Sequence, residues 1–320
     1  MISIVIPNYN GEKYLRECLT SIEAQTEKDY EVIIIDNAST DAEYEWLQDA
    51  NCSFKQLDRN YGFSRAVNEG IRFAKGEYVL LLNNDTVLAP DFLLKMKQCI
   101  EKDSHIFAVS SKMISYQDRS VIDDAGDEYT LLGWTLKCGD GKSVQYYTKE
   151  REVFSACAGA ALYRKKIFNE IGYFDEQFFA YMEDVDISYR ARIYGYRNVY
   201  CPDAHVYHIG SATSGSRYNA FKVKLAARNN IYVPYKNMPF VQLLINSPFL
   251  LIGILLKWLF FMKKGFGKIY KEGVIEGLKQ CHTLNKVPFK MRHLANYLKI
   301  EGLLIFNTVK FIQDRLRRTG

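Results

Sequence analysis

Two acidic motifs in this sequence have residue types and a spacing that could support metal-assisted chemistry. Asn83-Asn84-Asp85 directly follows the apolar run 78–82, and Glu183-Asp184-x-Asp186 opens a predicted helix. Asp85, at the end of a buried strand, could hold Mg²⁺ or Mn²⁺ through oxygen, and the cation would neutralise a leaving diphosphate. Asp184 could act as a general base that deprotonates an attacking hydroxyl group.

Both motifs also have local structural explanations. The first could be a turn with side-chain capping before Pro90, and the second could cap free N–H groups and complement the helix dipole. Taken alone, each motif is explained more simply by capping than by catalysis. The adjacent carboxylates of the second motif would, however, raise the pKa of one of them by like-charge repulsion, and a raised pKa favours proton uptake.

Three further places in the sequence could contact a ligand. His208 follows the extended segment 200–207 and precedes a glycine turn, so its imidazole could ligate a metal, although a lone histidine is more often structural. Asp36 ends a buried strand and could accept a hydrogen bond from a nucleotide base. Asn60 and Gly62 lie in a short turn before a helix, which would let backbone N–H groups approach an anionic ligand.

The elements that must position these residues alternate between strands and helices. Strands are predicted over 2–6, 32–35, 53–57 and 78–82, and helices around 14–22 and 63–74. This alternation is typical of βαβ units, so we expect an α/β fold with a mostly parallel sheet flanked by helices.

In such a sheet, ligands bind beyond the carboxyl ends of the strands. The residues at those ends are Pro7, Asn8 and Tyr9, then Asp36, then Asn84 with Asp85. We therefore expect three polar clusters to converge on one edge. The sequence has no GxGxxG motif and no P-loop, so a nucleotide would have to bind without them.

The middle of the chain gives a weaker signal. Residues 115–155 are punctuated by Gly and Asp, as in 123–127, which predicts loops or short antiparallel strands. After residue 183, helical spacing predicts a helix in which Val185, Tyr189 and Ile193 share a buried face.

Charge divides the sequence into two unlike parts. The net charge of +5 combines residues 1–210, with 23 Lys and Arg against 33 Asp and Glu, and residues 211–320, with 19 against 4. The basic residues of the second part alternate with aliphatic and aromatic stretches, which favours an anionic membrane surface over nucleic acid as the partner. Packing of these amphipathic helices on the rest of the chain or on a second subunit is the alternative.

Residues 240–262 are strongly apolar but interrupted. The interrupting residues are Gln242, Asn246, Ser247, Pro248 and Lys257. A helix lying in the membrane interface is therefore favoured over a spanning helix. Seven cysteines without a CxxC pair predict a reduced compartment, and a first segment that is a strand pattern predicts no secretion signal. We expect a cytoplasmic protein, peripheral on the inner face of the cell membrane, that could form homo-oligomers.

Six motifs, in order along the chain, resemble those of the family 2 glycosyltransferases. They are Val5–Asn10, Ile35–Asp41, Asn60–Phe63, Leu82–Thr86, Phe179–Asp186 and His208. More narrowly, the chain is similar to the rhamnosyltransferase-like branch that builds bacterial surface polysaccharides. The resemblance covers residues 1–235 and implies a GT-A fold, a nucleotide-binding α/β domain merged with an acceptor-binding region. Residues 236–320 would then form an amphipathic helical C-terminal region that associates with the membrane.

The resemblance implies a role for each candidate residue. Pro7, Asn8 and Tyr9 resemble the first nucleotide-contacting loop, Asp36 the acid that recognises the base, Asn60 with Gly62 the second loop, and Asn84 a further contact to the nucleotide sugar. Asp85 resembles the last acid of the DxD metal-binding signature, His208 the late metal-ligating histidine, and Asp184 the base. Asn83 replaces the first acid of the signature and leaves one carboxylate. Cys157–Arg164 and Arg228-Asn229-Asn230 also match the family, without an assigned role.

The implied activity is metal-assisted, inverting transfer of a sugar such as rhamnose, galactose or glucose. The donor would be a UDP- or dTDP-sugar, the acceptor a glycan or a lipid-linked molecule, and the process cell-surface polysaccharide synthesis. A sugar nucleotidyltransferase is one alternative, although the glycine-rich basic phosphate loop of such enzymes is missing from the sequence. A catalytically inactive, membrane-associated scaffold subunit is the other, although the base and both metal ligands are present. No nucleic-acid partner is expected.

Overall fold

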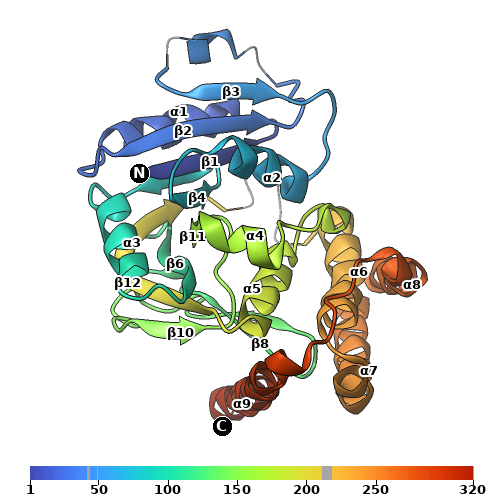
Figure 1. Cartoon of the computed structure of the whole chain (residues 1–320). Coiled ribbons are helices and arrows are strands. Elements are labelled where there is room, and N and C mark those ends of the chain that lie inside the picture. The colour runs from blue at the N-terminus through green and yellow to red at the C-terminus, as the bar shows by residue number, and fades with distance from the viewer. Residues whose placement is uncertain (42–43, 49, 211–217, 320) are drawn as a thin grey trace.

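Buried apolar runs form the strands of a central mixed sheet in the computed structural model, which describes residues 1–41, 44–48, 50–210 and 218–319 (Figure 1). The order across the sheet is β10 (Arg151–Val153), β12 (Arg197–His208), β6 (Ile106–Ser115), β11 (Ala160–Arg164), β4 (Tyr78–Leu82), β1 (Ile2–Asn8), β2 (Tyr30–Asp36) and β3 (Ser53–Gln56). The strands β3, β2, β1 and β4 are parallel, β6 is parallel to β12, and β11 runs antiparallel between β4 and β6. The predicted α/β fold is confirmed, and the parallel strands are gathered in β3–β2–β1–β4 and in β6–β12.

Helices cover both faces of this sheet because successive strand residues point to opposite faces and both sets are apolar. On one face, α1 (Glu12–Glu23) and α3 (Phe92–Glu101) pack against Ile4 and its neighbours. On the other face, α2 (Phe63–Phe73), α4 (Phe168–Ile171) and α5 (Glu183–Ile193) pack against Val5 and its neighbours. The helix predicted after residue 183 is α5, and its residues Val185, Tyr189 and Ile193 are buried as expected.

Short elements complete the sheet near its polar edge. The strand β5 (Thr86–Leu88) pairs antiparallel with the end of β12, and β7 (Ile122–Asp124) pairs antiparallel with β6. The strands β8 (Asp127–Tyr129) and β9 (Thr135–Lys137) form a separate hairpin. These pairings confirm the short antiparallel strands predicted within 115–155. Single turns of 3-10 helix occur at Glu45–Gln48, Lys165–Ile167, Glu176–Phe178, Cys281–Thr283 and Met291–His293.

The C-terminal helices pack against α5 and β8, in hydrophobic clusters separate from the two that flank the sheet. They are α6 (Ala220–Asn237), α7 (Phe240–Lys263), α8 (Gly267–Gln280) and α9 (Leu294–Thr319), seen at the right and bottom of Figure 1. Tyr232 of α6 and Leu304 of α9 share one hydrophobic cluster with Tyr129 of β8 and Tyr189 of α5. Helices α6 and α8 approach closely, because a Cβ on Gly273 would lie 2.4 Å from the Lys224 carbonyl oxygen.

Two of the polar residues that interrupt α7 face the protein. Gln242 and Asn246 donate from their side-chain amides to the Glu301 carboxylate of α9, at 2.7 and 2.9 Å. In the described part of the chain, α7 is the single helix whose length and apolar composition would let it cross a membrane, and 11% of its most apolar stretch is buried inside the protein.

Candidate active site

The carboxyl ends of β4, β1 and β2 are joined by hydrogen bonds between polar side chains. Asn84, just after β4, donates from Nδ2 to Asn8 Oδ1 at 2.6 Å, and Asn8 Nδ2 donates to Asp36 Oδ1 at 2.7 Å. Asn8 and Asp36 are direct neighbours because β1 and β2 pair in parallel with these residues in register. All three side chains are buried. The predicted convergence of three strand ends is therefore confirmed.

The Asp36 carboxylate is fixed by several donors. The Ser39 N–H and hydroxyl donate to it at 2.9 and 2.5 Å, and Gln56 Nε2 donates at 3.2 Å. Pro7 lies within β1, whereas Tyr9 lies just beyond that strand and is 37% exposed. This edge thus combines a rigid acidic centre with an accessible aromatic side chain.

Asn60 and Gly62 form the predicted turn before α2. Asn60 Oδ1 accepts a hydrogen bond from the Gly62 N–H at 2.8 Å, and Asn37 Nδ2 donates to the Gly62 carbonyl at 3.1 Å. Gly62 has φ +85°, and a Cβ at this position would lie 2.5 Å from the carbonyl oxygen of Phe179. Only glycine fits here, and the turn consequently lies against the segment that precedes Asp184.

Asp85 and His208 lie side by side although they are far apart in sequence. The pairing of β5 with β12 places Thr86 opposite His208, and the Ile209 N–H donates to the Asp85 carbonyl at 3.0 Å. Asp85 Oδ1 and His208 Nε2 are 3.5 Å apart. Two atoms that each lie about 2.1 Å from one ion are separated by roughly 3 to 4 Å, so this pair fits a shared divalent cation.

The metal-ligating set from the protein is small. No group of three or more His, Cys, Asp or Glu side chains able to hold a metal occurs among the residues the structure describes. Two protein ligands suffice for Mg²⁺, which keeps several waters and takes substrate phosphate oxygens as its other ligands. Asn83, at the position of the missing first acid, donates from its backbone N–H to the Gly159 carbonyl at 2.8 Å.

Asp123 of β7 is a functional candidate that the sequence did not single out. Its Oδ2 lies 2.7 Å from His208 Nδ1, and its Oδ1 lies 3.2 Å from Lys137 Nζ of β9. Burial acts to lower the pKa of His208, but the hydrogen bonds with Asp123 and Asp85 outweigh it and raise the pKa to about 9. Burial acts to raise the pKa of Asp123, but His208 and Lys137 hold it well below the usual range. A carboxylate on Nδ1 leaves Nε2 as the metal-facing nitrogen.

Asp184 lies half-buried in the first turn of α5. Its carboxylate accepts hydrogen bonds from the backbone N–H groups of Val185, at 2.8 Å, and of Ala158. Burial raises the pKa of Asp184, and these two hydrogen bonds offset the rise in part. The rise in pKa predicted from the sequence is confirmed, but its main cause is burial and not repulsion between like charges.

The segment 157–159 connects Asp184 to the end of β4. The Ala158 N–H donates to the Asp184 carboxylate, and the Gly159 carbonyl accepts from the Asn83 N–H. Asp124 lies near the same place, and burial raises its pKa to about 6 against the opposing charge of Lys137. The base, the strand end and these buried charges therefore belong to one site.

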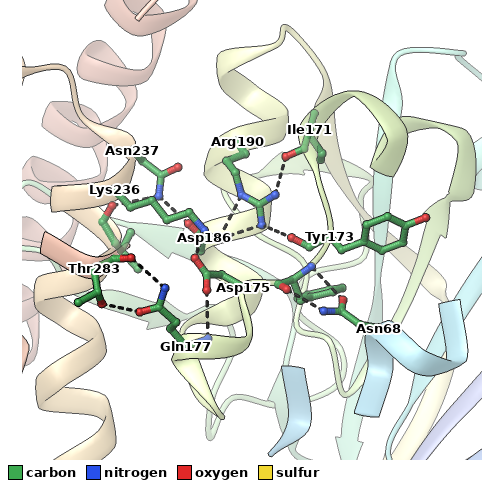
Figure 2. A network of polar contacts seen from close by, with 12 residues as sticks. Asn68, Ile171, Tyr173, Asp175, Gln177, Asp186, Arg190, Lys236, Asn237 and Thr283 are labelled. Carbon is green, nitrogen blue, oxygen red and sulfur yellow. Dashed lines mark hydrogen bonds and ion pairs between the residues drawn. The ribbon is translucent and has the colours of Figure 1, made fainter. Parts of the chain in front are cut away.

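Asp186, the last acid of the second motif, belongs to a buried structural network (Figure 2). Its Oδ2 accepts from Arg190 at 2.9 Å and from Lys236 at 3.0 Å, and its Oδ1 accepts from Asn237 at 2.8 Å. Burial acts to raise the pKa of Asp186, but Arg190 and Lys236 lower it below its ordinary value. Since Lys236 and Asn237 belong to α6, the network fixes the helix that carries Asp184 against α6.

Comparisons with known proteins agree on one family. The family model described as Glycosyl transferase family 2 matches residues 3–172. One curated relative is the glycosyltransferase GlyG of Streptococcus pneumoniae, which is 34% identical over 33% of this chain and 37% of its own length. Another is the poly-β-1,6-N-acetyl-D-glucosamine synthase of Staphylococcus epidermidis, which is 27% identical over 63% of this chain and 48% of its own length. Three curated relatives are matched over 25%, 37% and 30% of their length, so this chain spans well under half of each.

Among solved structures, a similar one is GalNAc-T7 with UDP, GalNAc and Mn²⁺. The TM-score is 0.59 and the identity 19%, over 71% of this chain and 47% of that chain. At this identity the likeness concerns the fold.

Proposed function

Because this chain belongs to glycosyltransferase family 2, we propose that it transfers a sugar from a UDP- or dTDP-linked donor to a hydroxyl group of a glycan or lipid-linked acceptor. One observation carries the proposal. The segment 157–159 contacts Asp184 on one side and the end of β4, two residues before Asp85, on the other, which supports a base close to the Asp85–His208 pair. A base beside a candidate metal pair, at the ligand-binding edge of an α/β sheet, is the arrangement that sugar transfer from a diphosphate requires.

The donor would lie along the edge made by the ends of β4, β1 and β2. The residues proposed to contact it are Pro7, Asn8, Tyr9, Asp36, Asn60, Gly62 and Asn84. Asp36 is held rigidly by its hydrogen bonds, so it would accept a base N–H without further ordering. The exposed ring of Tyr9 would pack on the nucleotide.

Asp85 and His208 would hold Mg²⁺ or Mn²⁺, and Asp123 would orient His208 from the other ring nitrogen. When bound, the ion would supply Lewis-acid stabilisation of the leaving diphosphate. Because the protein contributes a single carboxylate, the donor's phosphate oxygens would complete the site.

Asp184 would take the proton of the acceptor hydroxyl, and the freed oxygen would attack the anomeric carbon. The new bond joins that carbon to the acceptor oxygen, the bond to the diphosphate breaks on the opposite face, and the proton stays on Asp184. A single displacement of this kind inverts the configuration. The raised pKa of Asp184 supports the role, since proton uptake is most effective from a base whose pKa is near the working pH.

The test begins with turnover of a panel of UDP- and dTDP-sugars, with and without Mn²⁺. For the donor that turns over, Asp184→Asn should lower the rate on the order of a hundredfold or more, because the shape is kept and the base is lost. Asp118→Asn, an exposed acid on the loop before β7, is the matched control and should leave the rate unchanged. Near-normal turnover by folded Asp184→Asn, or retention of configuration in the product by NMR, would contradict the mechanism.

We further assign the chain to the rhamnosyltransferase-like branch and to synthesis of a cell-surface polysaccharide. The similarity to a poly-β-1,6-N-acetyl-D-glucosamine synthase over 63% of this chain supports a role in making glycan polymers. The donor panel tests the branch, because it predicts turnover of dTDP-rhamnose or of a UDP-hexose.

A membrane-facing surface is proposed for α7. Leu244, Leu251 and Leu255 are 61%, 64% and 50% exposed, and they lie on the helix face opposite to Gln242 and Asn246, which contact α9. A helix with its polar residues toward the protein and its apolar residues outward reverses the pattern of a soluble surface helix. Exposed Lys263 and Lys264 at its end would meet anionic headgroups, so we propose peripheral binding at the cytoplasmic face, where a lipid-linked acceptor is presented.

The membrane proposal is tested by surface substitutions, because α6 and α9 share the core of the chain and a truncation would disturb that core. Leu251→Glu combined with Leu255→Glu should lower binding to phosphatidylglycerol vesicles at least tenfold. Phe73→Glu, an equally exposed apolar residue on α2, is the control and should bind as the wild type does. The proposal would be contradicted if the double variant bound vesicles as the wild type does, or if the substitutions abolished self-association and left vesicle binding intact.

A further inference from the structure

The five residues before Glu183, which we call the base segment (residues 178–182), have a strained backbone. Phe179, Tyr181 and Met182 have φ angles of +63°, +70° and +69°. At Phe179, ψ is −65° and the Ala180 N–H donates to the Phe178 carbonyl at 2.7 Å, which together define a γ-turn of the rare, strained form. Such a backbone persists only where surrounding groups hold it.

One side chain from α6 holds the base segment. Asn229 Nδ2 lies 2.9, 2.9 and 2.7 Å from the carbonyl oxygens of Phe178, Ala180 and Tyr181. Asn229 is fully buried. Three carbonyl dipoles that point at one place repel each other, and a buried N–H₂ group placed between them shares its two hydrogens among the three oxygens.

Arg228, the preceding residue, orients this amide. Its Nε donates to Asn229 Oδ1 at 3.0 Å, which directs the N–H₂ side of the amide toward the base segment. A second nitrogen of the same guanidinium donates to the Phe178 carbonyl at 2.9 Å. Arg228 and Asn229 therefore act together on the γ-turn.

The base segment determines where α5 begins. The Met182 carbonyl accepts the N–H of Asp186, which is the first hydrogen bond of that helix, and a single residue separates Met182 from Asp184. At its other end, the Phe179 carbonyl accepts the N–H of Ser64 in α2, two residues after Gly62. A shift of the base segment would therefore move Asp184 relative to the donor-binding edge.

We propose that Asn229, oriented by Arg228, is a positioning residue that holds Asp184 in its reactive place through the carbonyls of the base segment. This inference rests on the proposed function in one respect, namely that Asp184 is the base. It assigns a role to the Arg228-Asn229 motif, which the donor, metal and base residues do not explain.

The test compares Asn229→Ala with Asn198→Ala. Asn198 is also fully buried, and its side-chain amide also donates to the backbone, but to one carbonyl only, that of Phe154 at 2.7 Å, outside the base segment. In Asn229→Ala, amide hydrogen exchange of residues 178–183 should accelerate at least tenfold and kcat should fall at least tenfold, while KM for the donor and the Kd of UDP or dTDP stay within about threefold. Asn198→Ala should change neither the exchange of that segment nor kcat.

A milder variant covers the case in which Asn229→Ala does not fold. Arg228→Met keeps the aliphatic stem and removes the guanidinium, so it should accelerate exchange of the same segment and lower kcat by a smaller factor. Unchanged exchange at 178–183, or a loss of nucleotide affinity as large as the loss of kcat, would overturn the proposal. Hydrogen exchange needs no turnover, so an inactive wild type, which would refute the proposed function, is distinguishable from a failure of this inference.

Discussion

Gly62→Ala should be among the most damaging single-atom additions to this chain. Gly62 has φ +85° and ψ 172°, a region that is essentially restricted to glycine, and forcing another residue into it costs about 1–3 kcal/mol. The new Cβ would also lie 2.5 Å from the Phe179 carbonyl oxygen and 2.6 Å from its ring. Relieving such an overlap in a packed interior costs about 1–3 kcal/mol more. The expected total loss of folding free energy is therefore about 2–6 kcal/mol.

Gly141→Ala is the matched control for this change. Gly141 has φ +75°, but nothing lies within 4 Å of a Cβ placed there, so this variant should show the backbone cost alone. Thermal unfolding followed by circular dichroism should give a clearly larger fall in Tm for Gly62→Ala than for Gly141→Ala. Adding Phe179→Ala removes the ring but keeps the carbonyl, so the double variant should recover part of the loss. Equal Tm values for the two glycine variants would refute this prediction, because the contact of the new Cβ with Phe179 would then not affect stability.

Two further predictions concern the metal pair and the base. Asp123→Asn should weaken Mg²⁺ binding about 10–100-fold by calorimetry, because His208 loses the carboxylate that orients it. The measurement is made above pH 9, where protons no longer compete with the metal for His208. The control variant Asp118→Asn should bind Mg²⁺ as the wild type does. For the base, burial raises the pKa of Asp184 above its ordinary 3.8, so kcat/KM should fall as the pH drops through that raised value. The same raised pKa means that the ionised carboxylate destabilises the folded state at neutral pH, so Asp184→Asn should raise Tm at pH 7, and the gain should shrink as the pH falls. A constant difference in Tm across pH would contradict this assignment.

Much of the fold could be predicted because its signals are local. The strands β1, β2 and β4 are largely apolar runs, since both of their faces are covered by helices, and polar residues stand at or just after the end of each. The convergence of Asn8, Asp36 and Asn84 then follows from the parallel arrangement alone. The order of the remaining strands could not be predicted, because β11 enters the sheet antiparallel between β4 and β6 through contacts distant in sequence.

Asp123 shows why part of the site could not be predicted from the sequence. It lies in a stretch punctuated by Gly and Asp, where acidic residues are ordinary turn formers. Its contact with His208 exists because β7 pairs with β6, and β6 pairs in turn with β12, which carries His208. Two successive strand pairings must be known before this carboxylate can be placed. No local pattern contains that information.

Asp184 and Asp186, in contrast, could have been separated by helix geometry. Residues two apart on an α-helix point about 200° from each other, so these two carboxylates cannot share a face. If one of them meets a substrate, the other must point into the protein and needs buried cations. Asp186 forms ion pairs with two such cations, Arg190 one turn further along α5 and Lys236 on α6. The spacing E-D-x-D therefore describes one candidate base and one anchor, and the anchor fixes the helix from which the base acts.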